Sequence, residues 1–377
     1  MNAATFEEDL TFMRGHSPLH LLSSPSGGRV AVSPRWQGRV MTSAVAGAAP
    51  SLGFVNRAFI ASGRTGTAFD NYGGEDRFWL GPEGGQHGLY FAPGAPFDLD
   101  AWQVPRGLQE GTWAVEDASD QAIGLRRVMT LASRSGFRFE VAVARTVRVL
   151  DGAGVAECFG VSLPSSSRWV AFESVSRITN AGANAWARDA GLLSVWILGQ
   201  FPATPDSVVV VPFARASGEV VNDRYFGAVP SDRLSVRERD GYLTFRADGQ
   251  HRSKIGVGPA RAKPVLGSHS PSAGSLTLVR YTLPAAGAYV NSMWELQEDP
   301  YAGDVVNSYN DGPVGGGRAA LGSFYEIETS SPAAPLGPGE SLTHAHATLH
   351  VSADGDALEH VAQAALGVSL RAVARAG

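Results

Sequence analysis

The stretch RFEVAVARTVRVL, residues 138–150, is rich in valine and phenylalanine and is bounded by glycine and aspartate. A second stretch of this kind, RWVAFESVSRITN, follows at residues 168–180, and shorter runs such as SVVVVPF and LTLVRYTL recur along the chain. Runs rich in β-branched and aromatic residues between turn residues are typical of antiparallel strands. With almost no helix between them, they predict an all-β protein built as a sandwich or barrel.

Pattern matching gives about fifteen to eighteen candidate strands, with uncertain boundaries. Short helices are expected near the two ends of the chain. Thr5 and Glu8 form a capping-box pattern, and Asp356 can begin a helix that Gly367 ends. Glycine and proline are spread through the turns, with neither a linker nor a repeat, so residues 1–377 are expected to form one domain.

Composition excludes several classes of protein. The chain has 44% hydrophobic and 18% charged residues, which is typical of a globular protein. Its net charge is −5 and its basic residues are scattered, so nucleic acid is not an expected partner. The N-terminus lacks the pattern of an export signal and no apolar run is long enough to span a membrane, so we expect a cytoplasmic protein with no membrane contact.

The segment Phe324–His350, FYEIETSSPAAPLGPGESLTHAHATLH, holds most of the candidate chemistry. Glu326 and Glu328 share one face of a predicted strand, which places their carboxylates roughly 6–7 Å apart. After a proline-glycine loop, His344 and His346 share one face of a second predicted strand. If the two strands pair, the acids lie near the imidazoles; otherwise both faces are turned to water. Alternate histidines also suit a metal ion, but nothing in the pattern demands one, and we expect no metal or cofactor.

Two other segments carry clusters of polar residues among glycines and aromatics. The first, NYGGEDRFWLGPEGGQHGLYF at residues 71–91, suits a carbohydrate, because aromatic faces match sugar rings and polar groups match hydroxyls. The alternative is a bent surface loop with local ion pairs. Its candidate binding residues are Glu75, Arg77, Trp79, Glu83, Gln86 and His87.

The second segment, residues 294–317, contains Asn307 and Asn310, which either bind hydroxyls or form an ordinary turn. The run HRSKIGVG contains Lys254 and Arg252, and a cation there either pairs with an acidic sugar or covers the edge of a sheet.

Several of these motifs together resemble the galactose mutarotase superfamily, which includes the aldose 1-epimerases. They are RITNAGANAW, the acid strand and loop IETSSPAAPLGPGESLTHAHATLH, the glycine-arginine pair of GRVMTSA, and GGEDRFWLGPEGGQ, which is similar to an uncharacterised bacterial branch. The resemblance covers most of the chain. It implies a large antiparallel β-supersandwich with short terminal helices, and it brings Arg39 into the site.

By this resemblance, Glu328 takes the position of the catalytic base. Mutarotation needs a base for the anomeric hydroxyl and an acid for the ring oxygen. The family's acid histidine is expected shortly after the ITN turn, where this sequence reads GLLSVWILGQF and has Trp196 instead. Either His87, His344 or His346 then supplies the acid, or the protein binds sugar without mutarotating it.

The sequence therefore predicts a partner that is a small-molecule sugar or an oligosaccharide. The first hypothesis is an epimerase or isomerase that uses Glu328 as base. The second is a carbohydrate-binding protein without catalysis. The third is another sugar chemistry on the same scaffold, uronate elimination or glycoside cleavage, which the clustered carboxylates of Glu75, Glu83, Glu326 and Glu328 would suit.

Overall fold

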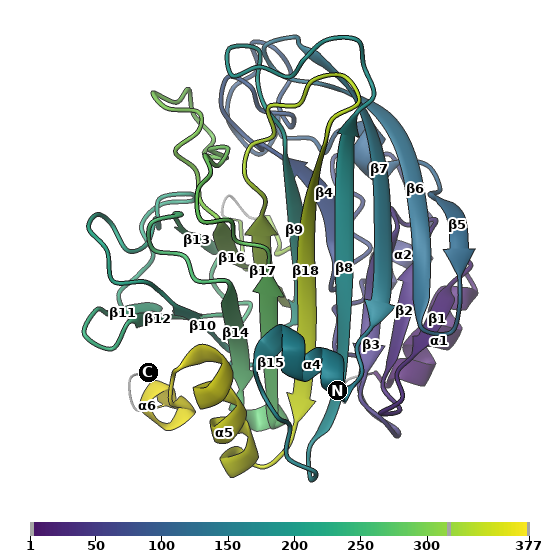
Figure 1. Ribbon diagram of the computed structural model, residues 1–377, viewed down its shortest axis with the longest axis vertical. Coiled ribbons are helices and arrows are strands. Elements are labelled where there is room, and N and C mark those ends of the chain that lie inside the picture. Colours follow the sequence, from purple (N-terminus) through teal and green to yellow (C-terminus); the bar gives the residue numbers. More distant parts are fainter. Residues whose placement is uncertain (1–3, 315–317, 375–377) are drawn as a thin grey trace.

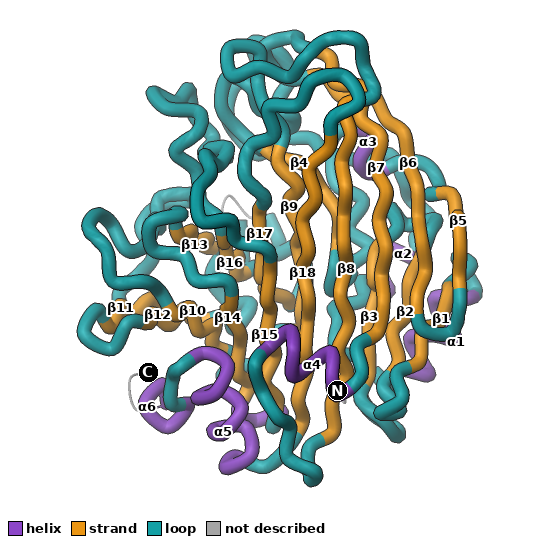
Figure 2. Tube along the Cα trace, in the orientation of Figure 1, coloured by secondary structure: helices purple, strands orange, loops and turns teal. Residues whose placement is uncertain are grey.

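Hydrogen bonding between strands gathers the chain into three sheets, in which every strand pair is antiparallel. The computed structural model describes residues 4–314 and 318–374, and the strands dominate it (Figures 1 and 2). Eighteen strands lie within the described residues, at the upper end of the expected number. The all-β fold class predicted from the sequence is thereby confirmed.

The largest sheet has ten strands, four of which are 11–13 residues long. In spatial order they are β11 (Leu234–Arg237), β12 (Tyr242–Arg246), β10 (Val208–Pro212), β14 (Val265–Ser270), β15 (Ser275–Tyr281), β18 (Ser341–Ser352), β8 (Arg168–Asn180), β7 (Arg138–Val149), β6 (Ala122–Ala132) and β5 (Ala114–Ala118).

The second sheet has five strands, and a third, smaller sheet has three. The five-stranded sheet is ordered β13 (Ser253–Val257), β16 (Val306–Asn310), β17 (Phe324–Ser330), β9 (Ser194–Pro202) and β4 (Arg77–Gly81). The three-stranded sheet is ordered β1 (His20–Ser23), β2 (Arg29–Ser33) and β3 (Arg39–Ala44).

The five-stranded sheet packs one face against the ten-stranded sheet, and the two form a sandwich. Ile327 of β17 and Phe201 of β9 are buried in one cluster with Val279 of β15 and Val209 of β10. The hydroxyl groups of Tyr325 and Ser268 join the two sheets by a hydrogen bond of 2.7 Å. Burial of these apolar faces is the main favourable contribution to folding.

Short helices cover parts of the sheets. Helices α4, α5 and α6 pack apolar side chains such as Phe159, Val361 and Val373 on the ten-stranded sheet (Figure 1). The six helices of the described residues are α1 (Phe6–Arg14), α2 (Arg57–Ala61), α3 (Arg106–Gln109), α4 (Gly152–Phe159), α5 (Gly355–Leu366) and α6 (Leu370–Ala374), and a 3₁₀ turn spans Pro271–Ala273.

The predicted capping box of the first helix is present, with Thr5 and Glu8 bonded to each other's backbone amides. The C-terminal helix differs in its start, since Asp354 caps it and not Asp356, while Gly367 ends it in the left-handed conformation as expected. Helix α4 lies mid-chain, where no helix was expected; Asp151 caps it and Gly160 ends it.

The two strands of residues 324–350 do not pair with each other, and Glu328, His344 and His346 are buried instead of turned to water, so the structure contradicts both alternatives left open by the sequence. β17 pairs with β16 and β9, whereas β18 pairs with β15 and β8 in the other sheet. The loop between them therefore crosses from one layer of the sandwich to the other. Thr329 of β17 faces His344 and His346 of β18 across the interior.

Charged groups also lie deep between the layers. Asp76 accepts a hydrogen bond from the guanidinium of Arg145 on β7, and both side chains are fully buried. Glu75 bonds to the ring of His350 on β18 at 2.8 Å. Buried charges are tolerated only with partners of this kind, because desolvation costs several kcal/mol per ion.

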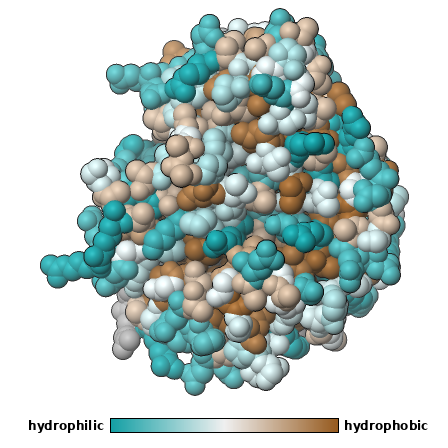
Figure 3. All heavy atoms as spheres, viewed as in Figure 1, coloured by the Kyte–Doolittle hydropathy of each residue, from teal (hydrophilic) through white to brown (hydrophobic). Residues whose placement is uncertain are grey.

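The face of the molecule shown in Figure 3 mixes apolar and polar residues, without one continuous apolar patch. Within the described ranges, five large apolar residues are exposed, namely Val115, Val128, Val236, Leu296 and Leu321. No helix of the described part of the chain has both the length and the apolar character needed to cross a membrane.

Replacement of Arg145 by leucine should destabilise the protein by about 3–5 kcal/mol, because Asp76 would remain buried without its counter-charge. Urea unfolding followed by circular dichroism measures the change. The matched control is Arg126→Leu, which removes the exposed pair with Glu116 on the same sheet and should leave the unfolding free energy nearly unchanged. Equal stability of Arg145→Leu and wild type would contradict the expectation.

Candidate functional site

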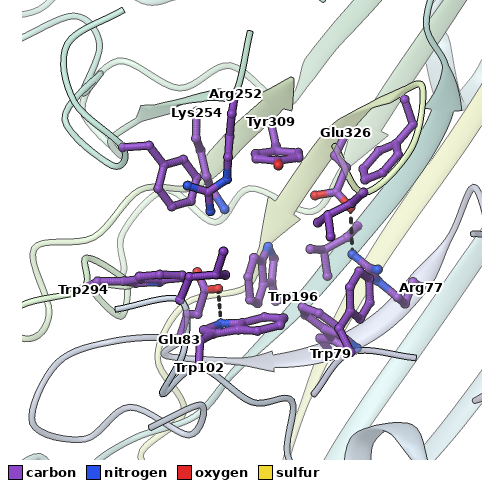
Figure 4. A pocket seen from close by; sticks show the side chains of 16 residues that line it. Arg77, Trp79, Glu83, Trp102, Trp196, Arg252, Lys254, Trp294, Tyr309 and Glu326 are labelled. Carbon is purple, nitrogen blue, oxygen red and sulfur yellow. Dashed lines mark hydrogen bonds and ion pairs between the residues drawn. The ribbon is translucent and has the colours of Figure 1, made fainter. Parts of the chain in front are cut away.

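A cavity lies on the face of the five-stranded sheet that is turned away from the sandwich core. The cavity has a volume of about 80 Å³. Aromatic and charged side chains line it together, as Figure 4 shows. The lining residues are Phe69, Arg77, Trp79, Glu83, Leu99, Trp102, Trp196, Leu198, Phe226, Arg252, Lys254, Trp294, Tyr309, Leu321, Phe324 and Glu326.

The two-residue period of each strand decides which side chains reach the cavity. On β17, Phe324 and Glu326 face it, while Tyr325 and Ile327 belong to the core between the sheets. The same alternation applies to the neighbouring strands. Their cavity-facing residues are Arg77 and Trp79 on β4, Trp196 and Leu198 on β9, Tyr309 on β16 and Lys254 on β13.

Four tryptophans form much of the wall. Trp79 and Trp196 come from adjacent strands and their rings lie edge to face at 5.5 Å. Trp102 and Trp294 come from the loops that cover the sheet and stack with ring centroids 6.3 Å apart. Indole faces provide flat apolar surfaces, and a wall of this kind suits the apolar face of a sugar ring.

Glu328 lies beneath the cavity, completely buried. Its Oε2 accepts hydrogen bonds from the ammonium of Lys254 at 2.8 Å and from the indole of Trp196 at 2.9 Å, and both donors line the cavity. Its Oε1 is buried with no hydrogen-bond partner among the described residues. This carboxylate is therefore compensated on one oxygen and able to accept a proton or a hydrogen bond on the other.

Glu326 borders the cavity next to Glu328 and pairs with Arg77 at 2.8 Å. Burial raises the pKa of Glu326 to about 7, although Arg77 opposes the shift. A carboxyl with this pKa exists in both protonation states near neutral pH, so it can donate a proton as well as accept one. Arg77 also stacks on the Trp79 ring at 4.1 Å, which fixes its position.

Glu83 approaches from the loop that follows β4. It accepts a hydrogen bond from the Trp102 indole at 2.8 Å, and burial raises its pKa although Lys254 opposes the shift. Burial disfavours the charge of Lys254 too, but the carboxylates of Glu328 and Glu83 outweigh this effect and raise its pKa. The acids and the ammonium therefore depend on one another for their charge states.

A second layer of polar groups holds this arrangement from the edge of the sheet. Asp304 accepts hydrogen bonds from Tyr225 at 2.6 Å and from Asn222 at 3.2 Å. Asn307 donates to the Tyr225 hydroxyl at 3.0 Å, and the Tyr225 ring lies 5.3 Å from the Lys254 ammonium. Gly256 leaves room for this cluster, since a Cβ there would lie 2.1 Å from the Asp304 carboxylate.

The structure thus brings together Arg77, Trp79, Glu83, Lys254 and Glu326 around one cavity, with Glu328 directly below it. Lys254 lies on the edge strand of its sheet, as one interpretation required, but its side chain is only 4% exposed and points inward to Glu328. It does not cover the sheet edge.

Other candidate residues make contacts within the protein and do not line the cavity. Asn307 and Asn310 lie on β16 and not in a turn, and Asn310 bonds to Gly249 and to the carbonyl of His251. Gln86 ties its loop to Gln297 through two hydrogen bonds of 3.0 Å. Arg39 bonds to backbone carbonyls and Gln37, and Glu75 faces the sandwich interior.

The three candidate histidines are not placed to assist Glu328. His344 and His346 both bond to the Thr329 hydroxyl, at 3.0 and 2.9 Å, and Thr329 points to the opposite face of β17 from Glu328. His87 is absent from the cavity lining and contacts Ser135 at 3.4 Å. None of the three histidines is among the residues that line the cavity. The described residues contain no cluster of three or more His, Cys, Asp or Glu side chains suited to a metal.

Several important residues were not identified from the sequence. Trp102 and Trp294 lie in loops rich in proline, glycine and acids, where a large apolar side chain has no strand face to explain it. A large apolar side chain in such a loop is the feature by which these two tryptophans could have been recognised as site residues. Phe226 is brought to the cavity only by folding, and no local pattern links it to the other lining residues.

Comparisons with known proteins agree on the fold. The model of a family described as "Family of unknown function (DUF6786)" matches residues 4–376. A crystal structure described as a candidate aldose 1-epimerase, from Escherichia coli K12, is 16% identical, covers 89% of this chain and 99% of its own, and has a TM-score of 0.53. The Slr1438 protein of Synechocystis sp. PCC 6803 is 14% identical, with coverages of 90% and 96% and a TM-score of 0.50.

A galactose mutarotase-like protein from Lactobacillus casei is 11% identical, with coverages of 89% and 99% and a TM-score of 0.48. Comparison with curated protein sequences finds no match. The fold is therefore the galactose mutarotase-like β-sandwich, as the sequence motifs implied.

Removal of the Lys254 ammonium should destabilise the protein, because Glu328 would be left buried without its counter-charge. We expect Lys254→Met to lower the free energy of unfolding by roughly 3–5 kcal/mol, and the double variant Lys254→Met/Glu328→Leu to recover much of the loss. Urea unfolding measures both. Arg224→Met, which breaks an exposed pair with Glu219, is the control. Strictly additive losses in the double variant would show that the two side chains do not interact.

Stability should fall as the pH is lowered, because burial lowers the pKa of His344 to about 3 and that of His346 to about 4. Between about pH 6.5 and 4 the unfolded chain, with histidine pKa values near 6.5, binds protons that the folded chain excludes. The raised pKa of Glu326 has the opposite effect on stability, because the folded chain binds a proton there that the unfolded chain has released. In urea unfolding from pH 7 to 4.5, His346→Gln should reduce the slope of free energy against pH by about 1.4 kcal/mol per unit. A slope equal to wild type would contradict this.

Proposed function

The chain belongs to the DUF6786 family, whose description assigns no function, and from the geometry of its site we propose that it binds a sugar in the tryptophan-walled cavity and interconverts its anomers. The observation that carries the proposal is the combination of aromatic walls with buried polar atoms that have no partner among the described residues. These atoms are Glu328 Oε1, Trp79 Nε1 and Arg77 Nη1. Sugar hydroxyls both donate and accept hydrogen bonds, so they can satisfy all three.

Glu328 is the proposed general base. Its Oε1 would take the proton of the anomeric hydroxyl, while the bond between the anomeric carbon and the ring oxygen breaks and the anomeric carbon becomes an aldehyde. Lys254 and Trp196 hold the other carboxylate oxygen and fix its orientation. Because the carboxyl returns the proton when the ring closes, the cycle needs no cofactor.

Glu326 is the proposed acid, in place of the histidine that the sequence lacks. It borders the cavity, it lies two residues from Glu328 on the same face of β17, and its pKa of about 7 leaves a proton available near neutral pH. It would protonate the ring oxygen as the ring opens and recover the proton as the ring closes. Arg77, paired with Glu326 at 2.8 Å, holds the carboxyl in place.

A carbohydrate-binding protein without catalysis is the second candidate. The burial of Glu328 favours it, since the carboxylate lies below the cavity wall and its Oε2 is already bonded to two side chains. Catalysis requires Lys254 or Trp196 to shift when sugar binds, whereas binding alone does not.

Wild-type protein should accelerate the exchange between α and β anomers of an aldose, measured by exchange NMR spectroscopy. Glu328→Gln should reduce the acceleration on the order of 100-fold or more, because the glutamine amide cannot act as a base. Glu326→Gln should slow exchange as well, with the loss greatest at the pH where wild type holds the Glu326 proton.

The matched control is Glu157→Gln, a change of the same kind at an exposed position on α4. It should exchange anomers at the wild-type rate. Sugar binding without acceleration for any aldose would favour the second candidate. The absence of both binding and acceleration would refute the proposal.

A further inference from the structure

Arg252 contributes a positive charge to the cavity that no carboxylate of the described residues compensates. Arg77 pairs with Glu326 and Lys254 pairs with Glu328, each at 2.8 Å. Arg252 takes part in no ion pair and no side-chain hydrogen bond with the rest of the described chain, and its Nε is buried without a partner. A guanidinium has five N–H donors and is charged at any physiological pH.

Aromatic rings hold the Arg252 guanidinium in place. Its central carbon lies 3.6 Å from the Phe226 ring centroid and 6.0 Å from that of Tyr309. Stacking on a ring face leaves the N–H groups free at the edge of the guanidinium plane, where they can bind an anion with two parallel hydrogen bonds. The group is therefore oriented before a ligand arrives, which reduces the entropy lost on binding.

Two of the three cations that line the cavity lie on the same side of it. Figure 4 shows Arg252 and Lys254 close together, with Arg77 and Glu326 on the other side and Trp196 between them. Glu83, the remaining acid of the lining, accepts a hydrogen bond from the Trp102 indole and forms no ion pair with Arg252. A ligand that spans the cavity would meet Glu326 and Arg77 at one end and the charges of Arg252 and Lys254 at the other.

Resting on the proposed function, the further inference concerns the class of sugar. We propose that the natural ligand is an acidic sugar, whose carboxylate or phosphate binds the guanidinium of Arg252 while its ring packs against the tryptophans. The anion would supply the counter-charge that the chain itself does not. A neutral hexose in the same place would leave Arg252 desolvated and unpaired, at a cost in affinity.

Calorimetric titration of the wild-type protein with matched sugars tests this inference. The pairs are galactose with galacturonate, glucose with glucuronate, and glucose with glucose 6-phosphate, so that only the group at carbon 6 changes. In at least one pair the acidic member should bind roughly ten to a hundred times more tightly than the neutral one, as a charge-assisted contact predicts. The uronate and phosphate arms distinguish the two kinds of anion.

Arg252→Gln should remove this preference, so that the acidic and neutral members of each pair bind with affinities within about threefold of each other. Arg188→Gln is the matched control, because Arg188 also stacks on an aromatic ring, Tyr301 at 4.2 Å, but is exposed and outside the cavity. It should keep the preference. If Arg252→Gln does not fold, the wild-type protein remains informative, since binding of the acidic sugar alone should weaken as salt rises.

A preference for neutral sugars, equal affinity within each pair, or a preference that survives Arg252→Gln would overturn the inference. Neutral sugars that bind and exchange anomers through Glu328, with no gain for the acidic members, would leave the proposed function intact and refute only the ligand class. Failure of every sugar to bind would refute both.

Discussion

The ion pair between Lys254 and Glu328 is the contact on which the arrangement of the site depends. It joins the edge strand β13 to β17, two strands away in the five-stranded sheet, and it places a charge of each sign in a buried position. Two charges in such a place are stable only together, because each would otherwise face the cost of its own desolvation. The indole of Trp196 and the cluster of Asp304, Tyr225 and Asn307 then fix the geometry around the pair.

Local patterns were enough to predict the fold class. The valine-rich strands of β7 and β8 and the capping box at Thr5 are short-range features, and each of them folds as its own residues indicate. The pairing of strands was harder, because it depends on contacts between segments far apart in sequence. β17 and β18 are neighbours in the chain and face each other from two sheets, a difference that alternation alone cannot reveal.

The same limit applies to the candidate site. Arg77, Trp79, Glu83, Lys254 and Glu326 were identified from residue type, and the fold brings them together. The contact of His344 and His346 with Thr329 was not predicted, because parity within β18 says which residues share a face and not which sheet that face meets. Trp102 and Trp294 reach the cavity through loops, where no periodic pattern exists to be detected.

The alternation along β17 has a consequence for how this scaffold can change. Ile327 and Thr329 maintain the contact between the layers, and Glu326 and Glu328, interleaved with them, face the cavity or lie just below it. Substitutions on one set of positions leave the other set in register, since side chains on opposite faces of a strand do not touch. Ligand chemistry can therefore diverge among related sequences while packing is conserved, which fits a fold shared at 14–16% identity.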